Sequence, residues 1–340
     1  MIWIRADANK EIGSGHVMRC LSIAAALQKL GQEVCFILAD EGARELLENS
    51  NMSYRLLDSG YDRMEEELEQ LERLIEQQKP ELLLIDSYFV TEHYLRSLQK
   101  LVKVVYVDDI PRFAYPVDGI INYNIYGDAL HYKEMTEKEQ KLILGATYAP
   151  LREQFQGITY EVNPVAKNVL LTTGGSDKYN LACTILEAVR SCEKTAQLQY
   201  HVVSGVFNPH FAMLEKLAAE HGNIHLYRNV ADMAALMKTC DIAITAGGST
   251  MYELCAVGVP TLCFSFVYNQ ELIVESFYKK EMVLYGGNYL KEQDAFGGNV
   301  VKALAVLAED VSLREAYSRK ERQLIDGRGA ERIASALCEM

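Results

Sequence analysis

Apolar and polar positions follow one another along this chain in two successive series of strand and helix patterns. Short runs rich in Val, Ile, Leu and Tyr are separated by stretches in which apolar residues recur every three or four positions. The strand-like runs of the first series are MIWIRAD, EVCFILAD, YRLLDS, ELLLID, KVVYVDD and GIINYN. The second series contains NVLLTTGG, LQYHVVSG, NIHLYR, DIAITAGG, TLCFSF and MVLYGG. Two such series predict two α/β domains, each a parallel sheet with helices on both faces.

A break in this pattern at residues 145–167 separates the two series. Pro150 and Pro164 interrupt the periodicity there. We therefore expect an N-terminal domain at 1–156 and a C-terminal domain at 165–340, whose last helix can pack back on the first domain. Ligands of parallel sheets bind beyond the carboxyl ends of the strands, so the expected site is a central cleft that both domains face.

Charge and composition restrict the classes of partner. The formal net charge of −13 argues against nucleic acid and anionic membranes as partners, whereas a small anionic molecule remains compatible. The opening MIWIRADANK lacks the pattern of a signal peptide, and no run of about 18 apolar residues occurs, so we expect a cytoplasmic protein. The eight cysteines form no Cys-x-x-Cys pair, which favours reduced, buried thiols over zinc ligands or disulfides. The oligomeric state is not predicted.

Three glycine-bearing turns follow predicted strands and lead into predicted helices. A helix start offers backbone amides to an anion, and glycine allows the ligand close to the backbone. The candidate residues are Gly13, Gly15 and His16 in the first turn, Gly174, Gly175 and Ser176 in the second, and Gly247, Gly248, Ser249 and Thr250 in the third. We expect the hydroxyl of Ser249 or Thr250 to cap a helix at residues 251–257. Neither a G-x-G-x-x-G fingerprint nor a Walker A motif is present, which disfavours a nicotinamide enzyme or a P-loop ATPase.

An acidic residue stands one helical turn beyond the third glycine turn. Glu253 follows Ser249 by four residues, so both lie on the same side of the predicted helix. A carboxylate in this place can accept hydrogen bonds from both hydroxyls of a ribose. Beside a diphosphate-binding turn, Glu253 is therefore the candidate ribose ligand.

Several segments resemble known families. Residues 241–270, DIAITAGGSTMYELCAVGVPTLCFSFVYNQ, resemble the nucleotide-sugar-binding region of GT-B glycosyltransferases. The opening RADANKEIGSGHVMRCLSIAAAL resembles a narrower group, the UDP-sugar hydrolases of pseudaminic acid synthesis. Further matches occur in the same order at DSY (86–88), VDD (107–109), LGATYAPLREQF (144–155) and TTGGSD (172–177). The resemblance implies a GT-B fold of two Rossmann-like domains and covers nearly the whole chain.

The resemblance also assigns roles to residues. It implies that His16 is the catalytic base and that Tyr88, Asn269 and Gln270 contact the sugar. Glu253 corresponds to the ribose-binding carboxylate. The uracil is expected near the backbone of Val230.

The implied reaction is hydrolysis of a UDP-linked 2,4-diacetamido-2,4,6-trideoxy hexose at its anomeric C–O bond. UDP is a good leaving group, so the protein has to supply a base for water and a site that holds the diphosphate. Neither a metal nor a cofactor is expected. Asp7 and Asp109 are both candidates for orienting His16.

Two alternatives remain open at the level of the sequence. An inverting GT-B glycosyltransferase needs the same base and the same UDP site, and differs only in its acceptor. A UDP-sugar-binding module would bind the same ligand without turnover. Release of UDP in the absence of an acceptor distinguishes the three.

Overall fold

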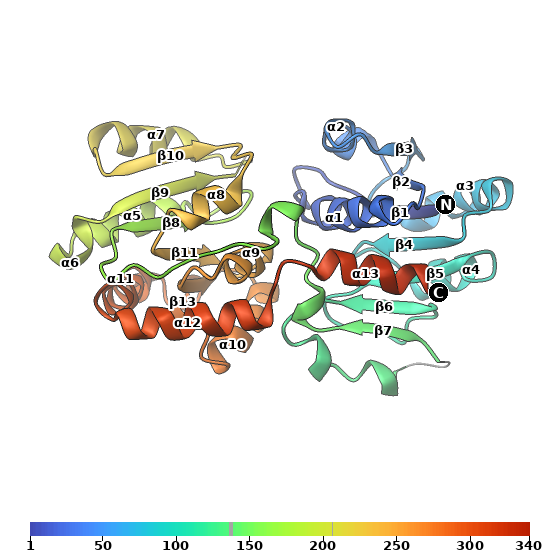
Figure 1. Ribbon diagram of the computed structural model, residues 1–340. Coiled ribbons are helices and arrows are strands. Elements are labelled where there is room, and N and C mark those ends of the chain that lie inside the picture. The colour runs from blue at the N-terminus through green and yellow to red at the C-terminus, as the bar shows by residue number, and fades with distance from the viewer. Residues whose placement is uncertain (136–138, 206) are drawn as a thin grey trace. The chain divides into compact units, whose positions relative to one another are not determined.

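The computed structural model describes residues 1–135, 139–205 and 207–340, with the backbone but not the side chain of Asn269. The chain divides into two compact units (Figure 1). Unit 1 comprises Met1–Arg152 and Arg328–Met340, and unit 2 comprises Glu153–Gly327. The sequence pattern places the boundary between residues 156 and 165, whereas the contacts place it after Arg152. The last helix, which the sequence analysis allowed to pack back on the first domain, belongs to unit 1.

Unit 1 is built on a seven-stranded parallel sheet with the order β3-β2-β1-β4-β5-β6-β7. Its strands are β1 (Ile2–Ala6), β2 (Val34–Leu38), β3 (Ser53–Leu56), β4 (Leu82–Asp86), β5 (Lys103–Val107), β6 (Gly119–Asn122) and β7 (Lys141–Leu144). The residues of β1, β2 and β4 are all buried, as their continuous apolar runs predict for strands covered on both faces. The edge strand β7 is absent from the expected strands.

The helices of unit 1 are α1 (Gly15–Lys29), α2 (Arg44–Asn49), α3 (Met64–Gln78), α4 (Glu92–Leu98) and α13 (Gly329–Cys338). Short 3₁₀ turns lie at Glu41–Ala43, Gly127–Ala129, Tyr132–Glu134 and Ala146–Tyr148. Helix α13 packs beside α1, although the two lie at opposite ends of the sequence. Close approach fixes the start of α13, since a Cβ at Gly329 would lie 2.1 Å from the carbonyl oxygen of Ala149.

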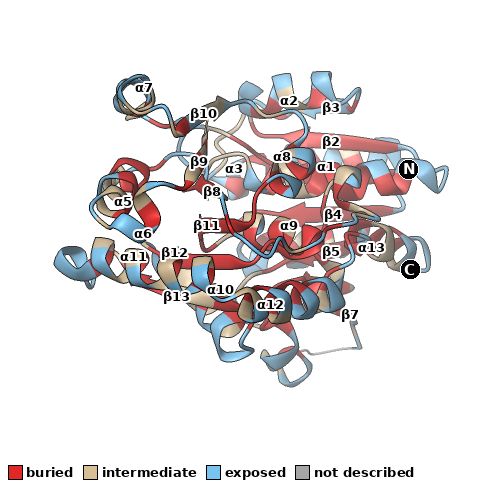
Figure 2. Ribbon diagram, turned by 60° about the vertical axis from the view of Figure 1, so that its left-hand side comes forward, coloured by how far each residue is buried: buried red, intermediate tan, exposed pale blue. Residues whose placement is uncertain are grey.

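Unit 2 contains a six-stranded parallel sheet with the order β10-β9-β8-β11-β12-β13. Its strands are β8 (Asn168–Thr172), β9 (Gln199–Ser204), β10 (Ile224–Arg228), β11 (Ile242–Ala246), β12 (Thr261–Ser265) and β13 (Val283–Asn288). Its helices are α5 (Leu181–Arg190), α6 (Glu193–Ala196), α7 (Phe211–Glu220), α8 (Met233–Lys238), α9 (Ser249–Val257), α10 (Tyr268–Lys279), α11 (Gln293–Glu309) and α12 (Val311–Leu324), and a 3₁₀ turn spans Glu153–Phe155. Figure 2 shows the central strands coloured as buried and the outer faces of the helices as exposed.

Across the described residues, no helix combines the length and the apolar character that a membrane span requires.

A carboxyl group without a hydrogen-bond partner lies inside unit 2. Glu321 of α12 is fully buried, and neither of its carboxyl oxygens bonds another group in the described part of the chain. Helix α12 packs against the end of α9, where a Cβ at Gly258 would lie 2.9 Å from Ser318 Oγ. Burial raises the pKa of Glu321 well above its ordinary value of 4.5.

Glu321 is expected to make unit 2 less stable as the pH rises. The folded state holds this proton more tightly than the unfolded chain, so the stability is complete below about pH 4.5 and falls as the pH approaches the raised pKa. The fall is at most about 1.4 kcal/mol per pH unit. Urea unfolding at several pH values should show this loss in the wild type but not in Glu321→Gln. The exposed Glu315 of the same helix supplies the control, Glu315→Gln, and parallel curves for wild type and Glu321→Gln would contradict the prediction.

Candidate active site

The first glycine turn forms a tight loop that ends at the start of α1. Asn9 and Gly13 exchange backbone hydrogen bonds, at 2.8 Å from Gly13 N to Asn9 O and 3.3 Å from Asn9 N to Gly13 O. Gly13 has a φ of +73°, a conformation that glycine adopts without strain. Helix α1 begins at Gly15, so His16 is its second residue and does not precede the helix. No side chain caps this start.

His16 is held by a carboxylate from the neighbouring strand. Its Nδ1 lies 2.6 Å from Oδ1 of Asp86, the last residue of β4. Strands β1 and β4 are adjacent and parallel, with Ala6 paired to Asp86, so the loop after β1 and the end of β4 meet at one sheet edge. The His16 side chain is largely buried, with 8% of its surface exposed.

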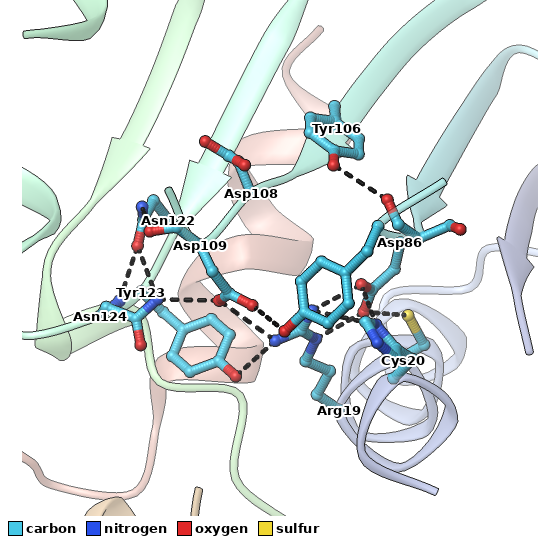
Figure 3. Close-up of polar contacts among 12 residues, drawn as sticks. Arg19, Cys20, Asp86, Tyr106, Asp108, Asp109, Asn122, Tyr123 and Asn124 are labelled. Carbon is cyan, nitrogen blue, oxygen red and sulfur yellow. Dashed lines mark hydrogen bonds and ion pairs between the residues drawn. The ribbon is translucent and has the colours of Figure 1, made fainter. Parts of the chain in front are cut away.

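Arg19, one helical turn after His16, binds both oxygens of the same carboxylate. Arg19 Nε donates to Asp86 Oδ2 at 2.5 Å and Nη2 donates to Oδ1 at 2.6 Å. Its Nη1 donates to the Tyr123 hydroxyl at 2.8 Å and lies 3.4 Å from Asp109 Oδ1. Figure 3 shows Arg19 reaching from α1 to Asp86 on one side and to Asp109 and Tyr123 on the other.

The charge state of Asp86 determines which nitrogen of His16 carries a proton. Burial works to raise the pKa of Asp86, but the neighbouring Arg19 and His16 outweigh burial and hold the pKa well below its usual range. An ionised carboxylate can only accept hydrogen bonds, so Nδ1 of His16 is the donor. In the neutral ring Nε2 then carries the lone pair, and no group in the described part of the chain bonds Nε2.

The two aspartates considered from the sequence have other partners. Asp7 forms an ion pair with the buried Arg5, and its Oδ1 accepts the backbone N–H of Ala39 at 2.8 Å. Asp109 accepts from the Tyr88 hydroxyl at 2.5 Å and from Asn124 Nδ2 at 2.9 Å. Neither bonds His16, and the carboxylate that does so is Asp86. The DSY segment contained this residue, but sequence alone gave no sign that it faces His16.

Tyr88 lies beside His16. The two rings meet edge to face with their centroids 4.6 Å apart, and 42% of Tyr88 is exposed. The hydrogen bond to Asp109 fixes the far end of the Tyr88 ring. Unit 1 therefore brings together two of the residues singled out in the sequence.

In unit 2 the third glycine turn leads into a helix that no side chain caps. Helix α9 begins at Ser249 with Gly248 as its N-cap, so the expected hydroxyl cap from Ser249 or Thr250 is wrong. The extended backbone of Gly248 places both hydroxyls inside the first turn, beyond the capping position. A Cβ at Gly247 would lie 2.7 Å from Val274 Cγ2, which explains why glycine stands there.

The second glycine turn differs from the expectation in one respect. Gly174 has a φ of +90°, and a Cβ added at Gly174 or Gly175 would meet no other atom within 4 Å. The start of α5, however, is occupied by the carboxylate of Asp177, which accepts the N–H groups of Leu181 at 2.7 Å and Ala182 at 3.1 Å. These two backbone amides are therefore not available to bind an anion. The exposed Ser176 and the two glycines precede the helix in an open loop.

The remaining predicted residues of unit 2 follow other strands of the same sheet. Val230 follows β10, half-buried, and Glu253 lies half-buried on α9. Gln270 accepts the backbone N–H of Phe266 through Oε1 at 3.0 Å, so this side chain supports the loop after β12. The side chain of Asn269 lies outside the described part of the structure. Because β8 and β11 are adjacent and parallel, their two glycine turns share one sheet edge.

This chain is similar to one protein-family model and to several curated proteins. Residues 169–321 match the model of the glycosyltransferase family 28 C-terminal domain. The uncharacterized protein MJ1062 of Methanocaldococcus jannaschii is 28% identical over 81% of this chain, which spans 57% of that protein's length. The spore coat polysaccharide biosynthesis protein SpsG of Bacillus subtilis is 25% identical over 100% of this chain and 98% of its own. The UDP-2,4-diacetamido-2,4,6-trideoxy-beta-L-altropyranose hydrolase of Campylobacter jejuni is 27% identical over 82% of this chain and 96% of its own length.

Solved structures agree on the fold. MurG of Acinetobacter baumannii superposes with a TM-score of 0.69 at 15% identity, covering 100% of this chain and 99% of MurG. The UDP-GlcNAc 2-epimerase of Neisseria meningitidis, bound to UDP-GlcNAc, gives a TM-score of 0.68 at 14% identity and covers 100% of each chain. The prediction of a GT-B-like fold with two parallel-sheet α/β domains is confirmed.

Proposed function

We propose that this protein hydrolyses a UDP-linked 2,4-diacetamido-2,4,6-trideoxy hexose at the anomeric C–O bond, releasing UDP and the free sugar. The observation that carries the proposal is the Asp86–His16 pair, in which Asp86 bonds Nδ1 and Nε2 bonds no group in the described part of the chain. The similarity to the Campylobacter jejuni hydrolase, over nearly the whole of that protein, supports the substrate class.

Each unit has a distinct task in this proposal. His16 removes a proton from water as the water oxygen attacks the anomeric carbon, and Asp86 stabilises the imidazolium that forms. Gly13 and Gly15 keep the backbone around His16 open. In unit 2 the uncapped start of α9, at Gly247–Thr250, binds the diphosphate, with the loop Gly174–Ser176 beside it and the uracil near Val230. Tyr88, Asn269 and Gln270 are the proposed sugar contacts.

The proposed reaction is tested by incubating the protein with the UDP-sugar and no acceptor. Stoichiometric UDP release supports hydrolysis. An inverting GT-B glycosyltransferase is the second candidate, because residues 169–321 match a glycosyltransferase family and MurG shares the fold. A glycosyltransferase would release UDP rapidly only when an acceptor is added. Binding of the UDP-sugar without release of UDP would indicate a binding module that does not catalyse.

Isotope labelling is expected to show which bond breaks. Attack at phosphorus usually recruits a metal or several cations, whereas neutral amides at a helix start suit a diphosphate that leaves intact. In ¹⁸O-labelled water the label should enter the sugar, with inversion at the anomeric carbon, and leave UDP unlabelled. A chelator should not reduce the rate. Label in the UDP phosphate, or loss of activity with the chelator, would contradict C–O cleavage without a metal.

Glu253 is expected to bind the ribose. Glu253→Ala should weaken UDP binding by roughly 1.5–3 kcal/mol, the range for hydrogen bonds to a charged group. A 2′-deoxy or 3′-deoxy UDP analogue should then bind the variant nearly as well as UDP. Calorimetry measures both affinities, and Glu309→Ala, which removes a surface partner of Lys194, is the control. Equal discrimination against the analogue by variant and wild type would place the ribose elsewhere.

A further inference from the structure

A small hollow in unit 1 lies against His16. Side chains from four segments line it, among them Ile12, His16, Tyr61, Asp86, Tyr88 and Phe89. The space open to the centre of a water molecule is about 10 Å³, which is about the room that one water needs. Histidine and carboxylate groups supply polar partners for that water, and the aromatic residues Tyr61, Tyr88 and Phe89 belong to the remaining lining.

Contacts on both sides hold the aromatic wall in place. The half-buried Tyr61 donates its hydroxyl hydrogen to Glu11, and its ring meets Phe89 edge to face with centroids 5.5 Å apart. On the other side, Tyr88 contacts the His16 ring and donates to Asp109 at 2.5 Å. The rings therefore cannot move apart to admit a larger molecule without breaking these contacts.

We propose that this hollow is the nucleophile pocket and that the Tyr61–Phe89 wall excludes nucleophiles larger than water. The inference rests on the proposed function and explains why the protein would hydrolyse a UDP-sugar and not transfer its sugar to an alcohol. In the reaction, the water oxygen forms a bond to the anomeric carbon while the bond to UDP breaks. The water proton passes to Nε2 of His16, and UDP leaves with the bonding electron pair. An alcohol would react in the same way and yield an alkyl glycoside, but the hollow has no room for the carbon chain of an alcohol.

Methanol tests the size of the pocket, because it adds a single methyl group to the nucleophile. The protein is incubated with UDP-2,4-diacetamido-2,4,6-trideoxy-altropyranose in water–methanol mixtures, and NMR gives the ratio of methyl glycoside to free sugar. We expect the wild type to form far less methyl glycoside than the mole fraction of methanol would give. Tyr61→Ala should raise the ratio by about tenfold or more, within the range that one methyl-sized group supplies in pocket discrimination.

Two further variants complete the experiment. Tyr61→Phe removes the hydroxyl that bonds Glu11 but keeps the ring, so its product ratio should equal that of the wild type. Phe89→Ala opens the same wall from the neighbouring loop and should raise the ratio even if Tyr61→Ala does not fold. The inference would be overturned if the wild-type ratio of methyl glycoside to free sugar already matched the mole fraction of methanol. It would also be overturned if folded Ala variants that release UDP kept the wild-type ratio. Either result would leave the proposed function standing. Absence of UDP release by the wild type would instead overturn the proposed function, and the inference with it.

Discussion

Replacing His16 with asparagine is expected to lower kcat for UDP release by about 10²–10⁴-fold, the usual contribution of a general base. The asparagine side chain can still form a hydrogen bond with Asp86, but it cannot accept a proton from water. UDP binding should be nearly unchanged, because the proposed UDP ligands belong to the glycine turns and α9 of unit 2. Steady-state kinetics gives kcat, and calorimetry gives the dissociation constant of UDP.

An exposed histidine of the same unit provides the control for this variant. His131 lies on the surface 3.3 Å from Glu134, and His131→Asn should keep both kcat and UDP affinity. A folded His16→Asn protein that loses UDP binding would contradict the assignment of UDP to unit 2. Retained turnover would show that another group accepts the proton.

Replacing Asp86 with asparagine should also lower kcat strongly, by about 10²–10⁴-fold. The carboxylate accepts the Nδ1 proton of His16, whereas an amide can donate to Nδ1 and so favour the tautomer in which Nε2 is protonated. The lost charge also removes one of the two carboxylate partners of the half-buried Arg19, so the variant should unfold more easily than the wild type.

The pH profile separates these two consequences of Asp86→Asn. If Asp86 had a purely structural role, the variant would contain less folded protein, but the acid limb of its kcat–pH profile would not move. Loss of the hydrogen-bond partner of His16 should instead shift that limb. Asp108→Asn is the matched control, because Asp108 follows the adjacent strand β5 and bonds the hydroxyls of Tyr115 and Tyr132. Its kcat profile should stay in place. An Asp86→Asn profile that coincides with the wild type would contradict the orienting role.

Local pattern was sufficient to predict most of the architecture. Continuous apolar runs such as residues 82–86 indicated strands buried on both faces, and the glycine turns after three other strands marked the carboxyl edge of each sheet. His16 was identified from its place in the first glycine turn, whereas its role and the selection of Tyr88 came from the family resemblance. The roles of His16, Tyr88 and Glu253 stay predictions until the variants are measured.

Helix starts show where local pattern fails. Ser249 and Thr250 are typical capping residues, yet neither caps α9, whereas Asp177 fills the start of α5 from four residues before it. Which residue caps a helix depends on the backbone angles of the residues before that helix, and composition does not specify those angles. Strand β7 was likewise missed, although β6 beside it has the same length of four residues and was expected.

By itself, the sequence determined where most strands and helices lie along the chain and the sheet edges at which functional groups can gather, because both follow from local periodicity and glycine geometry. It did not determine that His16 meets Asp86, 70 residues away. That pairing exists because the sheet places β1 directly beside β4, so that Ala6 and Asp86 end side by side and α1 starts over the carboxylate. The order of strands within a sheet is decided by packing among segments distant in sequence, so only the tertiary structure shows it.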